Sequence, residues 1–110
     1  MKRLALLLIS LAPVAVAQDA EITFKSTEIE PGIFMVEAVG GFGGGNMAVI
    51  VGDGHVVMID DSMPPFAEQL LAHVTETAGG PIDFMVNTHV HGDHTGGNAH
   101  FAASGTVVFA

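Results

Sequence analysis

Hydrophobic and polar residues alternate along the first half of the chain in the manner of β-strands. The apolar segments are separated by turn-forming residues, such as Pro31-Gly32 after the first and Gly52-Asp53-Gly54 before the last. Short apolar runs bounded in this way are typical of strands, and an Asp-Gly pair favours a tight hairpin. The pattern therefore predicts four strands, at residues 22–29, 33–39, 47–51 and 55–59.

A helical period replaces the alternation in the next segment. Apolar residues recur every four positions from Phe66 to Ala78, between Pro64-Pro65 and Gly79-Gly80-Pro81. Prolines at the start and glycines at the end are usual limits of a helix, so we expect one from about residue 64 to 78. The remaining patterns predict a strand at 82–86, a short helix at 98–103 and a strand at 106–109. With no repeat and no linker, the chain is expected to form one α/β domain.

The N-terminus has the composition of a secretory signal peptide. A basic start precedes an apolar stretch, and Ala15-Val16-Ala17 forms a small-residue cleavage motif before Gln18. The uncharged stretch at residues 4–17 is shorter than the roughly 20 residues of a membrane-spanning helix. We therefore expect a signal peptide at 1–17, cleavage between Ala17 and Gln18, a mature chain at 18–110, and a periplasmic or secreted location.

The mature chain is strongly acidic. Lys25 is its one cation, because Lys2 and Arg3 lie in the expected signal peptide. All twelve acidic residues lie after the signal peptide. Such a chain repels nucleic acid and anionic membrane surfaces, so we expect neither as a partner and predict a small-molecule substrate. The sequence contains no cysteine, which excludes disulfides and thiolate metal ligands.

Three imidazoles and one carboxylate lie within six residues of a single polar run. The run is Asn87-Thr88-His89-Val90-His91-Gly92-Asp93-His94-Thr95-Gly96-Gly97-Asn98, and it follows the predicted strand at 82–86. Its polar side chains therefore lie where a strand ends and a glycine-rich loop begins, a usual place for a functional site. Imidazole and carboxylate are preferred ligands of zinc and related divalent cations. We predict a metal site formed by His89, His91, Asp93 and His94.

The spacing favours two adjacent metal sites over one. In an extended segment His89, His91 and Asp93 point to the same side, and a turn at Gly92 allows His94 to join them. The alternative is the helical zinc motif, but it pairs histidines four residues apart, and Gly92 weakens a helix. We therefore assign His89 and His91 to the first cation, and Asp93 and His94 to the second.

The segment His89-Val90-His91-Gly92-Asp93-His94 resembles the His-x-His-x-Asp-His signature of the metallo-β-lactamase superfamily. The residues on either side of it match the usual flanks, and Val56-Val57-Met58-Ile59-Asp60 resembles the strand whose final Asp lies beside the metal-bound histidines. The resemblance covers about residues 45–110. It implies a four-layer αββα fold that needs a longer chain, so we expect the N-terminal half of that fold here. Sheet faces at 56–59 and 107–109 are then expected to be uncovered, and the 110-residue chain by itself inactive.

The resemblance also implies a hydrolase with two zinc ions, iron or manganese being alternative metals, and the N-terminal pattern adds that it is exported. In the family, residues matching His89 and His91 bind the first metal, and those matching Asp93 and His94 bind the second. Asp93 would orient a metal-bound hydroxide for attack on an ester, thioester, lactam or phosphoester. Asp60 would accept a hydrogen bond from a ligand imidazole and fix its tautomer. Two further hypotheses remain, an iron-dependent oxidoreductase on the same fold and a non-catalytic metal-binding fragment.

Several residues outside the motif have weaker assignments. Phe42 lies within a run of five glycines, which is either a flap that touches substrate or a plain hairpin turn. Asp61 takes the place of Asp60 if the strand register shifts by one residue. We expect His55, His73 and His100 to be surface residues.

Overall fold

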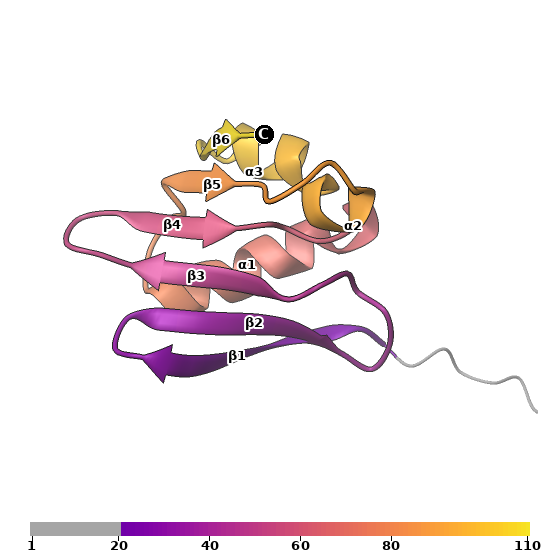
Figure 1. Cartoon of the computed structure of the whole chain (residues 1–110), viewed down its shortest axis with the longest axis horizontal. Coiled ribbons are helices and arrows are strands. Elements are labelled where there is room, and N and C mark those ends of the chain that lie inside the picture. The colour runs from indigo at the N-terminus through magenta and orange to yellow at the C-terminus, as the bar shows by residue number, and fades with distance from the viewer. Residues whose placement is uncertain (1–20) are drawn as a thin grey trace, which may run out of the picture.

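Six strands form one mixed sheet in the computed structural model, which describes residues 21–110 (Figure 1). The strands follow one another across the sheet in chain order: β1 (Thr23–Glu30), β2 (Ile33–Val39), β3 (Met47–Val51), β4 (Val56–Ile59), β5 (Phe84–Val86) and β6 (Val107–Phe109). Adjacent strands from β1 to β4 pair antiparallel, whereas β4, β5 and β6 run parallel to one another. The expected signal peptide at 1–17 lies outside the described residues.

Helices connect the parallel strands. The 3₁₀ turn η1 (Pro64–Phe66) leads into α1 (Ala67–Ala78), which joins β4 to β5. Two short helices, α2 (Gly92–Thr95) and α3 (Asn98–Ala103), lie between β5 and β6. Gly79 ends α1 in the left-handed conformation that favours glycine, with φ 72°. These elements agree with the sequence prediction to within two residues at each end, apart from α2, which was not expected.

The hydrophobic core lies between the sheet and α1 with α3. Val36, Val49, Met58 and Met85 point from successive strands toward this side, and all four are fully buried. Leu70, Val74 and Phe101 meet them from the helices, also fully buried, and Figure 1 shows α1 lying across one face of the sheet. The periodicity that predicted α1 is thus the pattern of its contacts with the core.

The opposite face of the sheet leaves large apolar side chains exposed. Val107 and Phe109 of β6 are 51% and 56% exposed. The expectation that β6 would be uncovered is confirmed for these side chains. For β4 it is wrong at Val56 and Met58, which alternate onto the α1 side and are buried there. Within residues 21–110, no helix is long and apolar enough to cross a membrane.

A chain of three polar side chains joins β1 to α1. The hydroxyl of Thr77 donates to the carbonyl of His73, at 3.0 Å. Its oxygen therefore accepts from the Ser26 hydroxyl at 2.8 Å, which in turn accepts from Nε2–H of His73 at 2.8 Å. This order makes His73 a hydrogen-bond donor and not a base for Ser26. His73 is partly exposed, so this expected surface residue also makes a contact between α1 and β1.

Asp61, directly after β4 and Asp60, carries a fully buried carboxyl group. Its Oδ1 accepts a hydrogen bond from the backbone N–H of Gly97 at 3.0 Å, while Oδ2 has no partner among the described residues. Burial raises the pKa of Asp61 to about 6, helped by the charge of Asp60 and opposed by the Gly97 N–H and by His94. The ionised form therefore costs folding free energy at neutral pH.

We expect Asp61→Asn to change the pH dependence of stability in the metal-free protein. The folded pKa of about 6 exceeds the ordinary value of 3.8, so the stabilising contribution of the protonated carboxyl is complete below pH 3.8 and is lost as pH rises through 6. The wild type should lose up to about 3 kcal/mol relative to Asp61→Asn across this window. Urea unfolding of both proteins with a chelator, from below pH 3.8 to above pH 6, measures the difference. Parallel stability curves would contradict the burial argument.

Candidate metal centre

The site lies at the carboxyl ends of two parallel strands. Ile59, the last residue of β4, is paired with Val86, the last residue of β5. The backbone N–H of Asp60 then donates to the carbonyl of Val86 at 3.0 Å, which brings the segments after both strands side by side. Asp60 and Ser62 have positive φ values of 61° and 104°, a costly conformation for residues other than glycine. The chain after β4 is therefore sharply bent where it meets the histidine motif.

The histidine motif is extended at first and then helical. His91 has extended backbone angles, and α2 begins at the next residue, Gly92. The prediction that Asp93 continues an extended segment is therefore wrong. Gly92 allows the chain to turn, and the α2 turn is closed by hydrogen bonds from His94 N–H and the Thr95 hydroxyl to the His91 carbonyl, at 2.9 and 3.3 Å. Asp93 and His94 consequently follow each other around one helical turn.

The Asp60 carboxylate joins both ends of this motif. Its Oδ1 accepts from the backbone N–H of Thr88 at 2.7 Å, and its Oδ2 accepts from the Thr88 hydroxyl at 2.7 Å and from His94 Nδ1 at 2.8 Å. Burial alone would raise the pKa of Asp60, but the hydrogen bonds from Thr88 and His94 outweigh it and lower the pKa below the ordinary value. The contact with an imidazole is the one expected from the sequence, and the role of Asp60 toward a metal remains a prediction.

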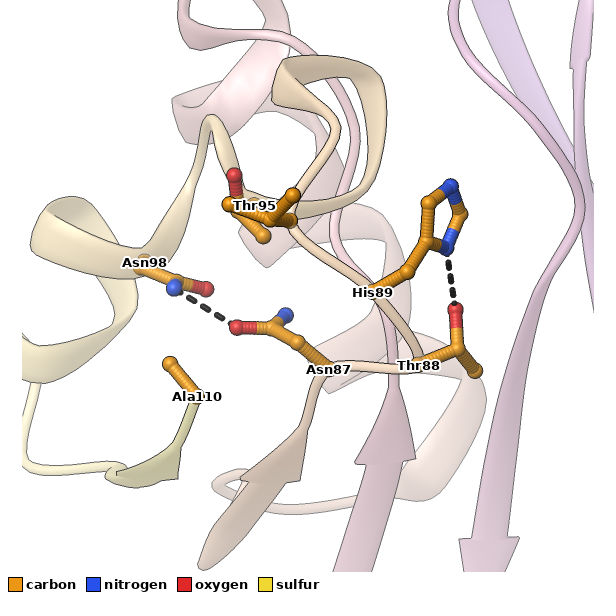
Figure 2. A pocket seen from close by; sticks show the side chains of 7 residues that line it. Asn87, Thr88, His89, Thr95, Asn98 and Ala110 are labelled. Carbon is orange, nitrogen blue, oxygen red and sulfur yellow. Dashed lines mark hydrogen bonds between the residues drawn. The ribbon is translucent and has the colours of Figure 1, made fainter.

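These hydrogen bonds fix the tautomers of two histidines. An ionised Asp60 can only accept, so Nδ1 of His94 donates to it. The Thr88 hydroxyl uses its proton on Asp60, so its oxygen accepts from Nδ1 of His89 at 2.8 Å, the bond drawn in Figure 2. In both rings the proton is held on Nδ1, and the lone pair of Nε2 is left for another partner. A neutral imidazole whose Nε2 lone pair is left open in this way has the form that metal ions bind.

The geometry brings the four predicted ligands together. The His94 and His89 rings have centroids 4.1 Å apart, and the His89 and His91 rings 4.8 Å. Nε2 of His94 lies 3.4 Å from Oδ2 of Asp93. Two ligand atoms at ~2.0–2.1 Å from one tetrahedral zinc ion are themselves about 3.4 Å apart. Asp93 and His94 thus have the separation of two ligands to one cation.

Asp60, His89 and His94 also form a group with metal-ligand chemistry. One ligand atom from each lies within 4.8 Å of the others. Asp60, however, already accepts three hydrogen bonds, which leaves it better suited to orient His94 than to bind an ion itself. The donor set of imidazole nitrogen and carboxylate oxygen fits a divalent cation such as zinc.

A pocket of about 420 Å³ opens beside His89. Its lining residues are Asn87, Thr88, His89, Val90, Thr95, Asn98 and Ala110. In Figure 2 the side chains of Asn87 and Asn98 point toward each other, joined by a 2.7 Å hydrogen bond, and Asn87 also donates to the His94 carbonyl at 3.0 Å. The pocket therefore lies next to the histidines and shares His89 with them.

The glycine run between β2 and β3 contacts the motif. Gly45 lies so close to His94 that a β-carbon there would be 2.9 Å from Nε2. Phe42, in the same run, is 70% exposed, and its expected contact with substrate remains a prediction. His100 is exposed on α3, as expected for a surface residue. The link from Asp60 through Thr88 to His89 and the approach of Gly45 to His94 were not predicted, because the Asp60–Thr88 and Gly45–His94 contacts join distant parts of the chain.

The chain resembles known metallo-β-lactamases in sequence pattern and in structure. The family model described as the metallo-beta-lactamase superfamily matches residues 40–109. The fold is similar to the metallo-β-lactamase FIM-1 from Pseudomonas aeruginosa in its mono-zinc form, with 24% identity and a TM-score of 0.69 over 84% of this chain and 43% of that chain. No match is found among curated protein sequences.

Two further solved structures are similar. A B3 metallo-β-lactamase with an active-site glutamic acid has 29% identity and a TM-score of 0.64, over 82% of this chain and 33% of that one. A HARLDQ-motif mutant of a metallo-β-lactamase from Cronobacter sakazakii has 27% identity and a TM-score of 0.62, over 76% and 33%. The chain thus spans less than half the length of these structures and corresponds to the N-terminal part of their fold. Because the family model matches more than half of the chain, the protein belongs to the metallo-β-lactamase superfamily.

Proposed function

We propose that this chain is the N-terminal part of an exported hydrolase that uses two zinc ions to cleave a small ester, thioester, lactam or phosphoester. The observation that carries the proposal is the orientation of His89 and His94, whose Nδ1 protons are held by Thr88 and Asp60 so that Nε2 of each ring is free to bind a cation. Superfamily membership supports the hydrolytic chemistry.

The residues divide into ligands and orienting groups. His89 and His91 would hold one cation, and Asp93 with His94 would hold the second. Divalent cations held there would lower the pKa of a bound water and polarise a carbonyl or phosphoryl oxygen. The Asp93 carboxylate, 3.4 Å from His94 Nε2, would orient the attacking water by accepting its hydrogen bond. Asp60 would keep His94 in place through the bond to Nδ1.

The expected partners and location follow from charge and from the N-terminal sequence. A chain with one cation after residue 17 is suited to a small-molecule substrate and not to nucleic acid or anionic membranes. The sequence pattern of residues 1–17 supports export to the periplasm or the medium. The rival hypothesis is an iron-dependent oxidoreductase on the same fold. Metal analysis of the isolated protein distinguishes the two, since the oxidoreductase would contain iron and the proposed hydrolase zinc.

We expect Asp60→Asn to lower zinc affinity about 10–100-fold, the usual effect of losing a group that orients a metal ligand. Asp60 accepts with both carboxylate oxygens, whereas Asn has one acceptor oxygen and a donating NH2 group. Either Thr88 or His94 therefore loses its acceptor, and the remaining oxygen is uncharged, so the ring of His94 is held less firmly. Zinc titration of the full-length protein against a competing chelator measures the affinity. Equal affinities in wild type and variant would show that Asp60 does not orient the ligand.

In the full-length protein, Asp93→Asn should reduce hydrolysis by about 100-fold or more, the usual effect of removing a group that moves or orients a proton. The control His100→Ala changes an exposed position on α3 and should retain nearly full activity. Both are assayed with zinc on a β-lactam, a thioester, a lactone and a phosphodiester. Similar losses in the two variants would place the reacting groups elsewhere.

Exported protein should begin at Gln18, because Ala15 and Ala17 are the small residues that signal peptidase requires. Mass spectrometry of protein recovered from the periplasm or medium identifies the first residue. Replacing Ala17 with a bulky residue should leave the precursor uncut. Protein outside the cytoplasm that retains Met1 would contradict the predicted cleavage.

A further inference from the structure

Gly45 lies directly beside the nitrogen of His94 that faces away from Asp60. A β-carbon at residue 45 would be 2.6 Å from Cε1 of His94 and 2.9 Å from Nε2. Real β-carbons essentially never approach another atom closer than 3.0 Å, so either the ring or the loop would have to move. The absence of a side chain at 45 leaves the Nε2 edge of His94 open.

The ring of His94 cannot move without losing several contacts. Its Nδ1 is bound to Asp60 at 2.8 Å. Its backbone N–H donates to the His91 carbonyl at 2.9 Å, and its own carbonyl accepts from the N–H of Asp61 and from the Asn87 amide, both at 3.0 Å. A rotation that relieved a contact at residue 45 would break the bond to Asp60, since the backbone is held on both sides.

The glycine run between β2 and β3, called the glycine loop below, is held equally firmly. The Ser62 hydroxyl donates to the carbonyl of Gly43 in a buried hydrogen bond. Gly44, with φ 106°, lies so close to the motif that a β-carbon there would be 2.7 Å from the carbonyl oxygen of Asp93. Ser62 itself follows Asp61 in the bent segment after β4. The loop therefore contacts the segment after β4 and the segment after β5, and it has little room to withdraw from His94.

We propose that Gly45 is a positioning residue of the metal centre: its bare backbone confines the His94 ring while leaving Nε2 open to a divalent cation shared with Asp93. This inference rests on the proposed function and adds a residue outside the histidine motif to it. A methyl group at 45 would occupy space next to Nε2 or displace the ring from Asp60. Either outcome weakens the Asp93–His94 pair and leaves the His89–His91 pair in place.

The test compares zinc binding by the wild type, Gly45→Ala and Gly80→Ala in the full-length protein. Gly80 is a matched control, because it has no positive φ and a β-carbon there meets nothing within 4 Å. We expect Gly45→Ala to lower the affinity of one zinc ion about 10–100-fold, as the loss of an orienting contact does, and Gly80→Ala to leave it unchanged. Competition with a chelator gives the affinities, and ¹⁵N NMR of labelled histidine shows whether His94 Nε2 still responds to zinc.

The outcomes separate this inference from the proposed function. A wild type that binds no zinc overturns both. A wild type that binds zinc, with Gly45→Ala binding equally and showing the same His94 Nε2 response, overturns the role of Gly45 alone. Loss of the response in Gly45→Ala, with the His89 response retained, supports it.

A double variant covers the case in which Gly45→Ala does not fold. The contact is with the His94 ring, so removing that ring should relieve it. We expect Gly45→Ala to lower the stability of the metal-free protein when His94 is present, and to have little effect on stability in the His94→Ala background. Urea unfolding gives the double-mutant cycle where Gly45→Ala folds, and where it does not, the folding of the double variant is itself the expected result. An equal loss of stability in both backgrounds would show that residue 45 meets something other than His94, and would overturn the proposal.

Discussion

The carboxylate of Asp60 is the contact on which the arrangement of the site depends. It stands at the end of β4 and accepts hydrogen bonds from Thr88 and His94, which lie on either side of His89 and His91 in the chain. One buried acceptor thus sets the path of the loop and the tautomer of His94 directly, and that of His89 through Thr88. Its lowered pKa follows from the same bonds and keeps the group ionised, which is the form that can only accept.

Local patterns in the sequence predicted most of the fold. Four strands were identified from alternation and from the turn residues between them, because a strand that packs on one side exposes every second residue. The helix from Ala67 to Ala78 was identified from its four-residue period and from the residues at its ends. Helix α2 was missed because glycine disfavours helices in general, yet Gly92 occupies the first position, where a turn into the helix matters more than propensity.

The composition of the site was predicted better than its geometry. The ligand-type residues are visible in the motif itself, and a contact between Asp60 and a ligand imidazole was expected from the resemblance to the metallo-β-lactamase superfamily. The link through Thr88, the burial of Asp61 and the approach of Gly45 to His94 join positions more than twenty residues apart, or depend on how tightly two segments pack. A single sequence contains no signal for such distances. Ser62, with a positive φ and a hydrogen bond to the glycine loop, is the plainest example of a residue whose role is visible only after folding.

The parallel pairing of β4 with β5 determines when in folding the site can exist. The antiparallel strands β1 to β4 are joined by short connections, so each can pair with a neighbour that is close in the chain. β5 pairs with β4 through a longer connection that contains α1. Closing that longer connection costs more chain entropy and is slower. Asp60 and Thr88 meet only when this pairing is complete, so the orientation of His89 and His94 is fixed late in folding. The four ligand-type residues are neighbours in the chain from the start, but the hydrogen bonds that hold their rings belong to the finished sheet.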